Sequence, residues 1–312
     1  MNKDHRSLFP SASSLQPPAF VIVGPTSVGK STLSIELARR LGGEIVGVDA
    51  FQLYRGLPIL TAQSPSEVVP QHLVGILSAE EECDAMRYCS MALPAIDEIS
   101  SRGKIPLFVG GTGFYLRALL SPLDPLPTAD ATLRAQFAAA SHQELLAQLE
   151  QLDPGAPSQI DTNNRRRLER ALEIILLTGK PLAEVWKKNR EASPLIPGIF
   201  LTRDREDLYQ RIETHVHLMF DQGVLDEVAA LGPLSHTATM TLGLREIQAH
   251  LRGEMTLADT IQTIIQSTKR YAKRQMTWFR NQHAFPELNL SRFSSLEAAA
   301  EAALPLLCNG SL

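Results

Sequence analysis

Cysteine is scarce in this chain of 312 residues, and the three that occur, Cys83, Cys89 and Cys308, follow no zinc-ligand or redox spacing. Their odd number and their spacing indicate a reduced, cytoplasmic setting. No uninterrupted apolar run approaches the roughly 20 residues that a bilayer crossing needs. Residues 1–18 contain no apolar segment of signal-peptide length, and their Ser and Pro content predicts a flexible leader. We therefore expect a cytoplasmic protein that does not use a membrane.

A strong excess of charge is also missing, because the formal net charge is only -4. The protein as a whole is therefore no basic coat for nucleic acid, and any RNA site must be a local patch. Hydrophobic residues make up 44% of the chain, which is ample for a core. Length alone predicts one large domain or two smaller ones.

Short apolar runs alternate with segments of helical periodicity, which predicts an α/β fold with a parallel sheet flanked by helices. The expected strands are residues 19–23, 44–48, 105–109 and 198–202. The expected helices are residues 31–41, 85–102, 206–227 and 256–280.

Domain boundaries are expected at two proline-rich breaks, where the amino-acid composition of the sequence changes. Residues 121–197 contain no convincing strand and predict a mostly helical insertion. The catalytic core would then consist of residues 19–120 and 198–285. Residues 286–312 carry little signal and are assigned to a tail.

The first expected strand leads into a loop that fits the pattern G-x-x-x-x-G-K-[ST] and opens a helix. The loop consists of Gly24, Pro25, Thr26, Ser27, Val28, Gly29, Lys30 and Ser31. In such a P-loop, backbone N–H groups and the N-terminal end of the helix bind phosphate oxygens, and the lysine adds a positive charge. The Ser31 hydroxyl can bind Mg²⁺, so the motif predicts a magnesium-assisted site for a diphosphate or a nucleotide such as ATP.

Two further motifs of nucleotide hydrolases are missing. The expected strand at 105–109 ends in Gly110-Gly111-Thr112-Gly113, without the acidic residue of a Walker-B strand. The base-recognition motif Asn-Lys-x-Asp is absent as well. These absences argue against a plain nucleotidase.

Asp49 follows the second expected strand and lies at the edge where ligands bind in open α/β sheets. A carboxylate there could take a proton from a nucleophile beside the bound phosphates. An N-cap or turn aspartate is the alternative, and the sequence leaves both open. Thr112 in the glycine-rich stretch would bring a hydroxyl group to the same edge.

Basic residues gather in two places. The late basic cluster, spaced so that its members share one side of a helix, consists of Lys269, Arg270, Lys273 and Arg274. The other lies in the helical insertion, in the stretch Arg166, Arg167, Leu168, Glu169 and Arg170. Two such clusters suit a long polyanion, although a solvated cationic face would give the same pattern.

Five stretches, in order, resemble the tRNA dimethylallyltransferases, also called tRNA isopentenyltransferases. They are GPTSVGKS (24–31), VDAFQLYRGL (48–57), PLFVGGTGFYLRALL (106–120), RRLERALEIILLTGKPLAE (166–184) and RYAKRQMTWFR (270–280). The third and fifth are more diagnostic than the phosphate loop. The resemblance implies a P-loop NTPase-like sheet with a tRNA-binding helical insertion.

The resemblance also implies an activity. The loop would hold the diphosphate of dimethylallyl diphosphate, with Mg²⁺ sharing the charge, and the prenyl group would pass to the exocyclic amine of the adenine 3′-adjacent to the anticodon. Asp49 would accept the proton of this amine, and Thr112 and Arg245 would complete the catalytic set. The partner would be a tRNA anticodon stem-loop, bound by a monomer.

The tRNA contacts implied by the resemblance come from three places. They are the stretch Asp49, Ala50, Phe51 and Gln52, the insertion stretch Arg166–Arg170, and the late basic cluster.

The chain departs from the family pattern at several positions: Ala50 replaces a serine, Leu60 a glycine, Gln63 a lysine and Met240 an arginine. Two other functions therefore stay open. One is a small-metabolite kinase that uses ATP, and the other is a homologue that binds tRNA with weakened catalysis.

Overall fold

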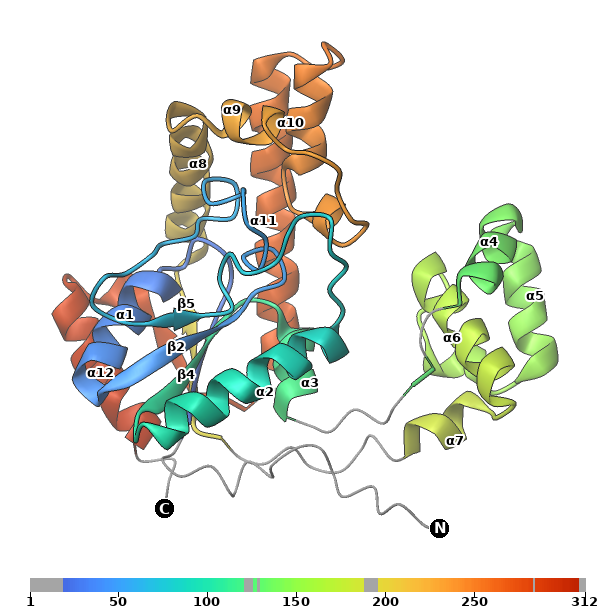
Figure 1. Ribbon diagram of the computed structural model, residues 1–312, viewed down its shortest axis with the longest axis horizontal. Coiled ribbons are helices and arrows are strands. Elements are labelled where there is room, and N and C mark those ends of the chain that lie inside the picture. The colour runs from blue at the N-terminus through green and yellow to red at the C-terminus, as the bar shows by residue number, and fades with distance from the viewer. Residues whose placement is uncertain (1–18, 121–125, 128–129, 188–195, 283, 309–312) are drawn as a thin grey trace. The chain divides into compact units, whose positions relative to one another are not determined.

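The computed structural model describes residues 19–120, 126–127, 130–187, 196–282 and 284–308 (Figure 1). The chain divides into two compact units. One is formed by residues 1–120 together with 194–312, and the other by residues 121–193.

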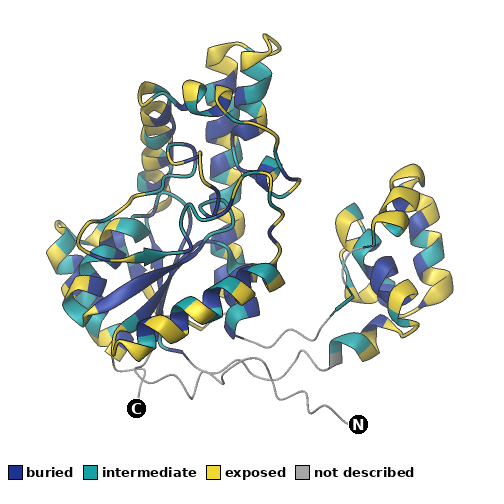
Figure 2. Cartoon of the chain, in the orientation of Figure 1, coloured by how far each residue is buried: buried dark blue, intermediate teal, exposed yellow. Residues whose placement is uncertain are grey.

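The first unit is built on a parallel six-stranded sheet with the order β3-β2-β4-β1-β5-β6. Its strands are β1 (Phe20–Val23), β2 (Gly43–Val48), β3 (Gln71–His72), β4 (Ile105–Gly110), β5 (Gly198–Thr202) and β6 (Glu287–Asn289). Every residue of β1, β2 and β5 is buried, as the dark strands in Figure 2 show. Burial of both faces explains why these strands are mostly apolar, with Glu44 in β2 and Thr202 in β5 as the exceptions.

Helices cover both faces of the sheet (Figure 1), so the predicted fold class is confirmed. Four of them, α1 (Lys30–Leu41), α2 (Ala85–Ser101), α3 (Gly113–Leu120) and α12 (Leu296–Cys308), pack around the strands. The first ends at Gly42, whose φ of 66° is a conformation that glycine adopts at low cost. The second begins at Asp84, whose side chain accepts a hydrogen bond from the Arg87 backbone.

Four more helices complete this unit: α8 (Arg205–Asp221), α9 (Val224–Ala229), α10 (Leu244–Leu251) and α11 (Leu257–Gln282). The long helix α11 contacts α8, α10 and α3. Short 3₁₀ turns occur at Ala238–Met240 and Leu290–Arg292.

The strands β3 and β6 and the helices α3, α10 and α12 were not expected from the sequence. The strands β3 and β6 have only two and three residues, too few for a period-2 pattern to show. Helix α12 is alanine-rich and contains Pro305, which breaks the usual helix signals. The segment assigned to a tail thus adds a strand beside β5 and a helix against α1.

The second unit is helical across its described residues. It contains α4 (Ala131–Ala139), α5 (His142–Leu152), the 3₁₀ turn Ala156–Gln159, α6 (Arg165–Thr178) and α7 (Leu182–Lys187). Its core is formed by Phe137, Leu145, Leu149, Ala156, Leu168, Ala171, Leu172, Ile174, Ile175 and Leu182. The side chains of Ser141 and Glu144 form a capping box at the start of α5.

None of the helices in the described parts of either unit combines the length and the apolarity that crossing a membrane would need.

A charged cluster lies at the opposite end of β2 from its carboxyl end. Glu44 is only 5% exposed and accepts hydrogen bonds from His72 Nε2 (2.7 Å) and Arg102 Nη2 (2.8 Å). Burial alone would raise the pKa of this carboxyl group, but the bonds from His72 and Arg102 outweigh burial and lower it. The cluster therefore joins β2, β3 and the end of α2.

Replacing Glu44 by glutamine should lower the free energy of unfolding by about 1.5–3 kcal/mol at pH 7, the range for hydrogen bonds to charged groups. Because the pKa of Glu44 is lowered in the fold, its contribution is present above the unfolded pKa of about 4.3 and is lost as pH falls through the folded value. Urea unfolding at pH 7 and pH 3 would measure this. The difference between E44Q and wild type should shrink at pH 3.

The matched control is Glu254→Gln, which removes an exposed pair with Arg252 and should leave the urea midpoint nearly unchanged. An equal loss for E44Q at both pH values would contradict the assigned role of the carboxylate.

Candidate active site

Four loops meet at the carboxyl edge of the sheet. They follow β1 (residues 24–29), β2 (from residue 49), β4 (residues 111–112) and β5 (from residue 203). The central strand β1 lies between β4 and β5, so the loop after it is flanked by the loops that leave both neighbours. This edge is where open α/β sheets bind ligands.

The phosphate loop is held tightly against β5. A Cβ atom on Gly24 would lie 2.7 Å from the Leu201 carbonyl oxygen, so no side chain fits there. Gly29, with φ of 108°, turns the chain into α1. Ser27 has a φ of 60°, and its hydroxyl is buried without a hydrogen-bond partner among the described residues. A strained loop with an unpaired buried oxygen at a helix N-terminus suits a bound phosphate.

Lys30 extends back over the phosphate loop. Its Nζ donates hydrogen bonds to the carbonyl oxygens of Gly24 (3.0 Å) and Pro25 (2.8 Å). Burial lowers the pKa of the ammonium group to about 8, although nearby Asp49 partly opposes this. A diphosphate bound beside Lys30 would supply negative charge that stabilises its ammonium group.

Asp49 is the carboxylate of the site. Its Oδ1 accepts a hydrogen bond of 3.0 Å from the Phe51 backbone. Burial raises its pKa in spite of this bond and of the charge on Lys30. A raised pKa makes the carboxylate a better proton acceptor near neutral pH. The structure thus places Asp49 close enough to Lys30 for each to shift the pKa of the other.

Thr112 is fixed to the same arm. Its Oγ1 accepts a hydrogen bond of 3.0 Å from the Ala50 backbone, and its own N–H donates to the Val48 carbonyl oxygen (3.1 Å). A Cβ atom on Gly110 would lie 2.0 Å from that same oxygen, which explains the glycine before this turn. The predicted catalytic residues Asp49 and Thr112 therefore come together.

Helix α11 contributes three residues that sequence analysis missed: Tyr271, Gln275 and Trp278. Gln275 hydrogen-bonds the backbone of both Thr26 and Gly111. The Tyr271 hydroxyl interacts with the side chains of Thr112 and Gln275, and burial raises its pKa, with Asp49 adding to the rise. Positions 271, 275 and 278 are spaced i, i+4 and i+7 and share a face. This spacing can be recognised in the sequence. The basic residues between these positions led instead to the prediction of a tRNA-binding surface.

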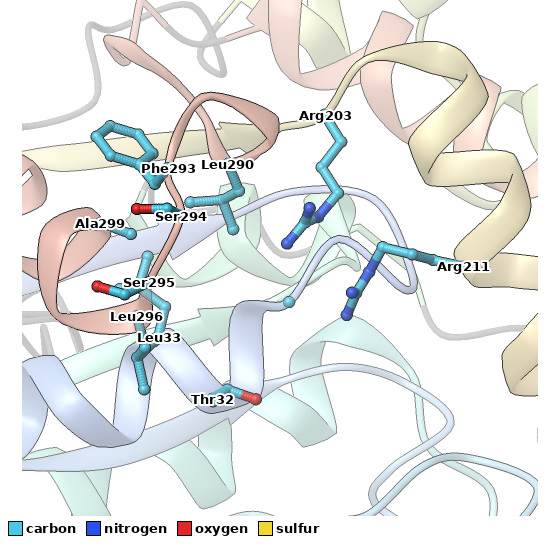
Figure 3. A pocket seen from close by; sticks show the side chains of 11 residues that line it. Thr32, Leu33, Arg203, Arg211, Leu290, Phe293, Ser294, Ser295, Leu296 and Ala299 are labelled. Atoms are coloured by element: carbon cyan, nitrogen blue, oxygen red, sulfur yellow. The ribbon is translucent and has the colours of Figure 1, made fainter.

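The back of the phosphate loop is supported by two arginines, also missed. Arg203 Nε donates to the Val28 carbonyl oxygen (2.8 Å) and Arg211 Nε to that of Ser27 (3.0 Å). Both line a cavity of about 270 Å³ beside the start of α1 (Figure 3). Arg203 also pairs with Asp207, which accepts a hydrogen bond from Ser291. Isolated arginines after a strand give no motif, which is why the sequence did not reveal them.

The loop after Asp49 is held by its own glutamines. The Gln52 amide donates to the Thr61 carbonyl oxygen (2.9 Å), and the Gln63 amide donates to that of Tyr54 (2.8 Å). The Phe51 ring lies 6.0 Å from the Tyr271 ring, centroid to centroid. Of the stretch expected to contact the base, Phe51 thus contacts the site face of α11, and Gln52 stabilises the loop.

Comparison with known proteins places this site in a family. The sequence profile described as IPP transferase matches residues 52–282, and the profile described as Isopentenyl transferase matches residues 17–68. The chain belongs to the IPP transferase family. A curated relative from Akkermansia muciniphila, named tRNA dimethylallyltransferase, is 42% identical over 283 residues, which is 90% of this chain and 96% of the relative.

Solved structures agree with this assignment to the IPP transferase family. The tRNA isopentenylpyrophosphate transferase of Bacillus halodurans is 34% identical, with a TM-score of 0.67, covering 94% of this chain and 98% of that one. A eukaryotic dimethylallyltransferase captured acting on tRNA is 26% identical with a TM-score of 0.78, covering 92% of this chain and 77% of that one. The expected P-loop NTPase-like fold is confirmed.

In this IPP transferase the late basic cluster divides between two sides of α11. Lys269 pairs with Glu213 and lies 5.1 Å from the Tyr209 ring centroid, so it is engaged with α8. Lys273 lies near the same ring, in a groove of about 590 Å³. Arg270 and Arg274 are exposed, and Arg274 lies over the Tyr271 ring, 5.6 Å from its centroid. Only this pair shares a side with Tyr271.

Arg245 stands apart from the other predicted catalytic residues. Arg245 is exposed on α10, and its Nη2 lies 3.5 Å from Met240 Sδ. Met240 is the residue that replaces an arginine of the family pattern. The described residues show no hydrogen bond or ion pair between Arg245 and the phosphate loop. Its catalytic role stays a prediction.

The basic stretch of the insertion is mostly structural. Leu168 is buried in the core of this unit, Glu169 pairs with Arg165, and Arg170 pairs with the buried Glu173. Arg166 and Arg167 are exposed. The predicted tRNA contact is therefore best carried by Arg166 and Arg167.

The raised pKa of Asp49 and the lowered pKa of Lys30 predict a bell-shaped dependence of kcat/KM on pH. Activity should rise as pH passes the raised pKa of Asp49, because the carboxylate form increases. It should fall above about pH 8, where free Lys30 loses the proton that holds its positive charge. Initial rates of prenyl transfer from pH 5 to pH 10 would measure both limbs.

The control is Lys30→Arg, whose guanidinium stays charged throughout. Its overall rate should be lower, but the fall near pH 8 should disappear. A wild-type profile that stays flat to pH 10 would contradict the assignment of that limb to Lys30.

Proposed function

We infer that this chain is a tRNA dimethylallyltransferase. It would transfer a dimethylallyl group from dimethylallyl diphosphate to the exocyclic amine of the adenine 3′-adjacent to the anticodon. One observation carries this reading within the family: a phosphate loop lies beside a partly buried carboxylate whose pKa is raised by desolvation. Leaving-group binding and proton removal thus occur in one place.

The reaction needs little from the protein beyond position and charge. The bond between C1 of the allyl group and the diphosphate oxygen breaks, and a bond from the adenine nitrogen to C1 forms. Asp49 accepts the proton that the nitrogen loses. Lys30 and the N–H groups at the start of α1 stabilise the negative charge that develops on the diphosphate. The target base must leave its stack to reach the site, which a single-stranded loop makes inexpensive.

Magnesium fits this site as a partner of the diphosphate. The described residues contain no group of three or more His, Cys, Asp or Glu side chains that could hold a metal ion alone. Mg²⁺ commonly uses one or two protein oxygens together with substrate phosphates and water. The Ser31 hydroxyl, in the first turn of α1, would provide such an oxygen. When bound, the ion would neutralise part of the charge on the leaving group.

Neither alternative is favoured. A small-metabolite kinase would share the phosphate loop, but the whole-length relatives are named tRNA dimethylallyltransferases. A homologue with weakened catalysis was suggested by Gln63 and Met240. In the structure, the Gln63 amide bonds the backbone of its own loop. Thr112 still bonds the Ala50 backbone, and Asp49 lies close enough to Lys30 to raise the pKa of its ammonium group. The monomeric state and the cytoplasmic location stay predictions of the sequence.

Prenyl transfer is tested with purified protein, Mg²⁺, unmodified tRNA and labelled dimethylallyl diphosphate. Label should appear on the base 3′-adjacent to the anticodon. Asp49→Asn should cut turnover by about 10²-fold or more, as expected for loss of a general base, while diphosphate binding stays nearly unchanged. ATP turnover without label on tRNA would instead support the kinase.

Asp97→Asn serves as the matched control, because Asp97 is exposed on α2, away from the carboxyl edge of the sheet. It should transfer label at the wild-type rate. If D49N were as active as D97N, Asp49 would have no part in the chemistry.

The division of the late basic cluster predicts unequal effects on tRNA binding. Changing Arg270 and Arg274 together to alanine should weaken binding and reduce the slope of log K against log salt by up to about 2, one unit for each phosphate that the variant no longer neutralises. Lys269→Ala should change the slope less, because Lys269 is already paired with Glu213. Filter binding over a salt series would measure the slopes.

As a control, Arg39 and Arg40 on α1, which pair with Glu36, can be changed together. An unchanged slope in the Arg270 and Arg274 variant would make this side of α11 an ordinary solvated surface.

A further inference from the structure

The side chain of Gln275 is buried at the active site and uses both ends of its amide. Only 5% of the residue is exposed. Its Oε1 accepts a hydrogen bond of 2.9 Å from the Thr26 backbone, and its Nε2 donates one of 3.0 Å to the Gly111 carbonyl oxygen. The first partner belongs to the phosphate loop and the second to the turn after β4. A single amide therefore joins two loops that are distant in sequence.

The connection continues from Gly111 to the arm that carries Asp49. Thr112, the next residue, accepts the hydrogen bond from the Ala50 backbone. Tyr271, one turn before Gln275 on α11, interacts through its hydroxyl with the side chains of both Thr112 and Gln275. The path from Thr26 to Asp49 thus consists of buried and part-buried hydrogen bonds, joined by the backbone from Gly111 to Thr112 and from Ala50 to Asp49, with Gln275 at its centre.

The fit around this amide is tight. A Cβ atom on Gly111 would lie 2.3 Å from Gln275 Nε2, so the turn can approach only because it has no side chain. The phosphate loop would hold the diphosphate of dimethylallyl diphosphate. The arm that carries Asp49 would orient the adenine amine that receives the prenyl group. Their separation sets the distance between the reacting atoms.

We propose that Gln275 is a positioning residue, which fixes the phosphate loop relative to the Gly111–Thr112–Ala50–Asp49 arm and so sets the approach of the adenine amine to C1 of the allyl group. This inference rests on the proposed function. Gln275 supplies no proton and no charge to the reaction. Its removal should therefore lower the rate of the chemical step more than it weakens the binding of either substrate.

Glutamine is the side chain that this position requires. Thr26 presents a donor and Gly111 an acceptor, and an amide group offers the complementary acceptor and donor together. A leucine of similar size offers neither. A carboxylate could accept from Thr26, but its second oxygen would face the Gly111 carbonyl oxygen, and the two would repel.

The first test is Gln275→Leu, assayed in single turnover with saturating donor and tRNA. The rate of prenyl transfer should fall about 10–100-fold, because a misplacement near 1 Å can cost about 10²-fold in rate. The KM for dimethylallyl diphosphate and the Kd for tRNA should stay within about threefold of wild type. Full activity, or a normal chemical rate with a raised donor KM, would overturn the proposal.

The second test is Gln275→Glu, because its result depends on pH in a way that a packing role would not produce. The protonated carboxyl group can donate to the Gly111 carbonyl oxygen, whereas the carboxylate cannot. The rate of Q275E relative to wild type should therefore rise as pH falls. Tyr271, whose pKa is raised, stays neutral over the assay range, while the charges of Asp49 and Lys30 are common to both proteins. A constant ratio would overturn the proposal.

Gln262→Leu is the matched control, since Gln262 is exposed on the same helix and should transfer label at the wild-type rate. Thermal melting of each variant shows whether it is folded. Wild-type protein that transfers no label would overturn the proposed function and this inference together. An active wild type with an equally active Q275L would overturn the positioning role alone.

Discussion

The active site depends on two opposite charges that are partly buried at one edge of a parallel sheet. Lys30 and Asp49 each lose hydration there, and burial moves the pKa of each toward neutrality while their mutual attraction opposes the shift. Burial thus makes Lys30 receptive to an anionic ligand and Asp49 receptive to a proton. Both properties come from the same partly buried surroundings at the edge of the sheet.

Close backbone approach brings these groups together. The glycines at 24, 110, 111 and 113 occupy places where a Cβ atom would collide with a neighbouring strand or with α11. The family stretches that looked like phosphate and turn motifs are therefore also packing motifs. The glycines admit the neighbours, and the polar residues beside them, Thr26 and Thr112, are held at fixed separations as a result.

Much of this arrangement was predictable from the sequence, because it is encoded locally. Buried strands such as β1 and β5 are mostly apolar runs, and the phosphate loop has a recognisable spacing. The particular contacts of Gln275, Arg203 and Arg211 were not predictable, because each joins a residue far away in the chain. The tail was misjudged for a related reason: β6 has only one buried side chain, Leu288, and gains its strand pairing from β5. The spacing of the basic residues in α11 correctly predicted a helix. It did not reveal that Tyr271, Gln275 and Trp278, which lie among these basic residues in the sequence, face the site.

The support of the phosphate loop by α8, α11 and the β6 region has a consequence for biosynthesis. The loop leaves the ribosome long before Arg203, Gln275 and Ser291 are made. A nascent chain therefore contains the phosphate-loop sequence before the residues that support this loop exist. The phosphate site is complete only when the distant segments have packed against the loop.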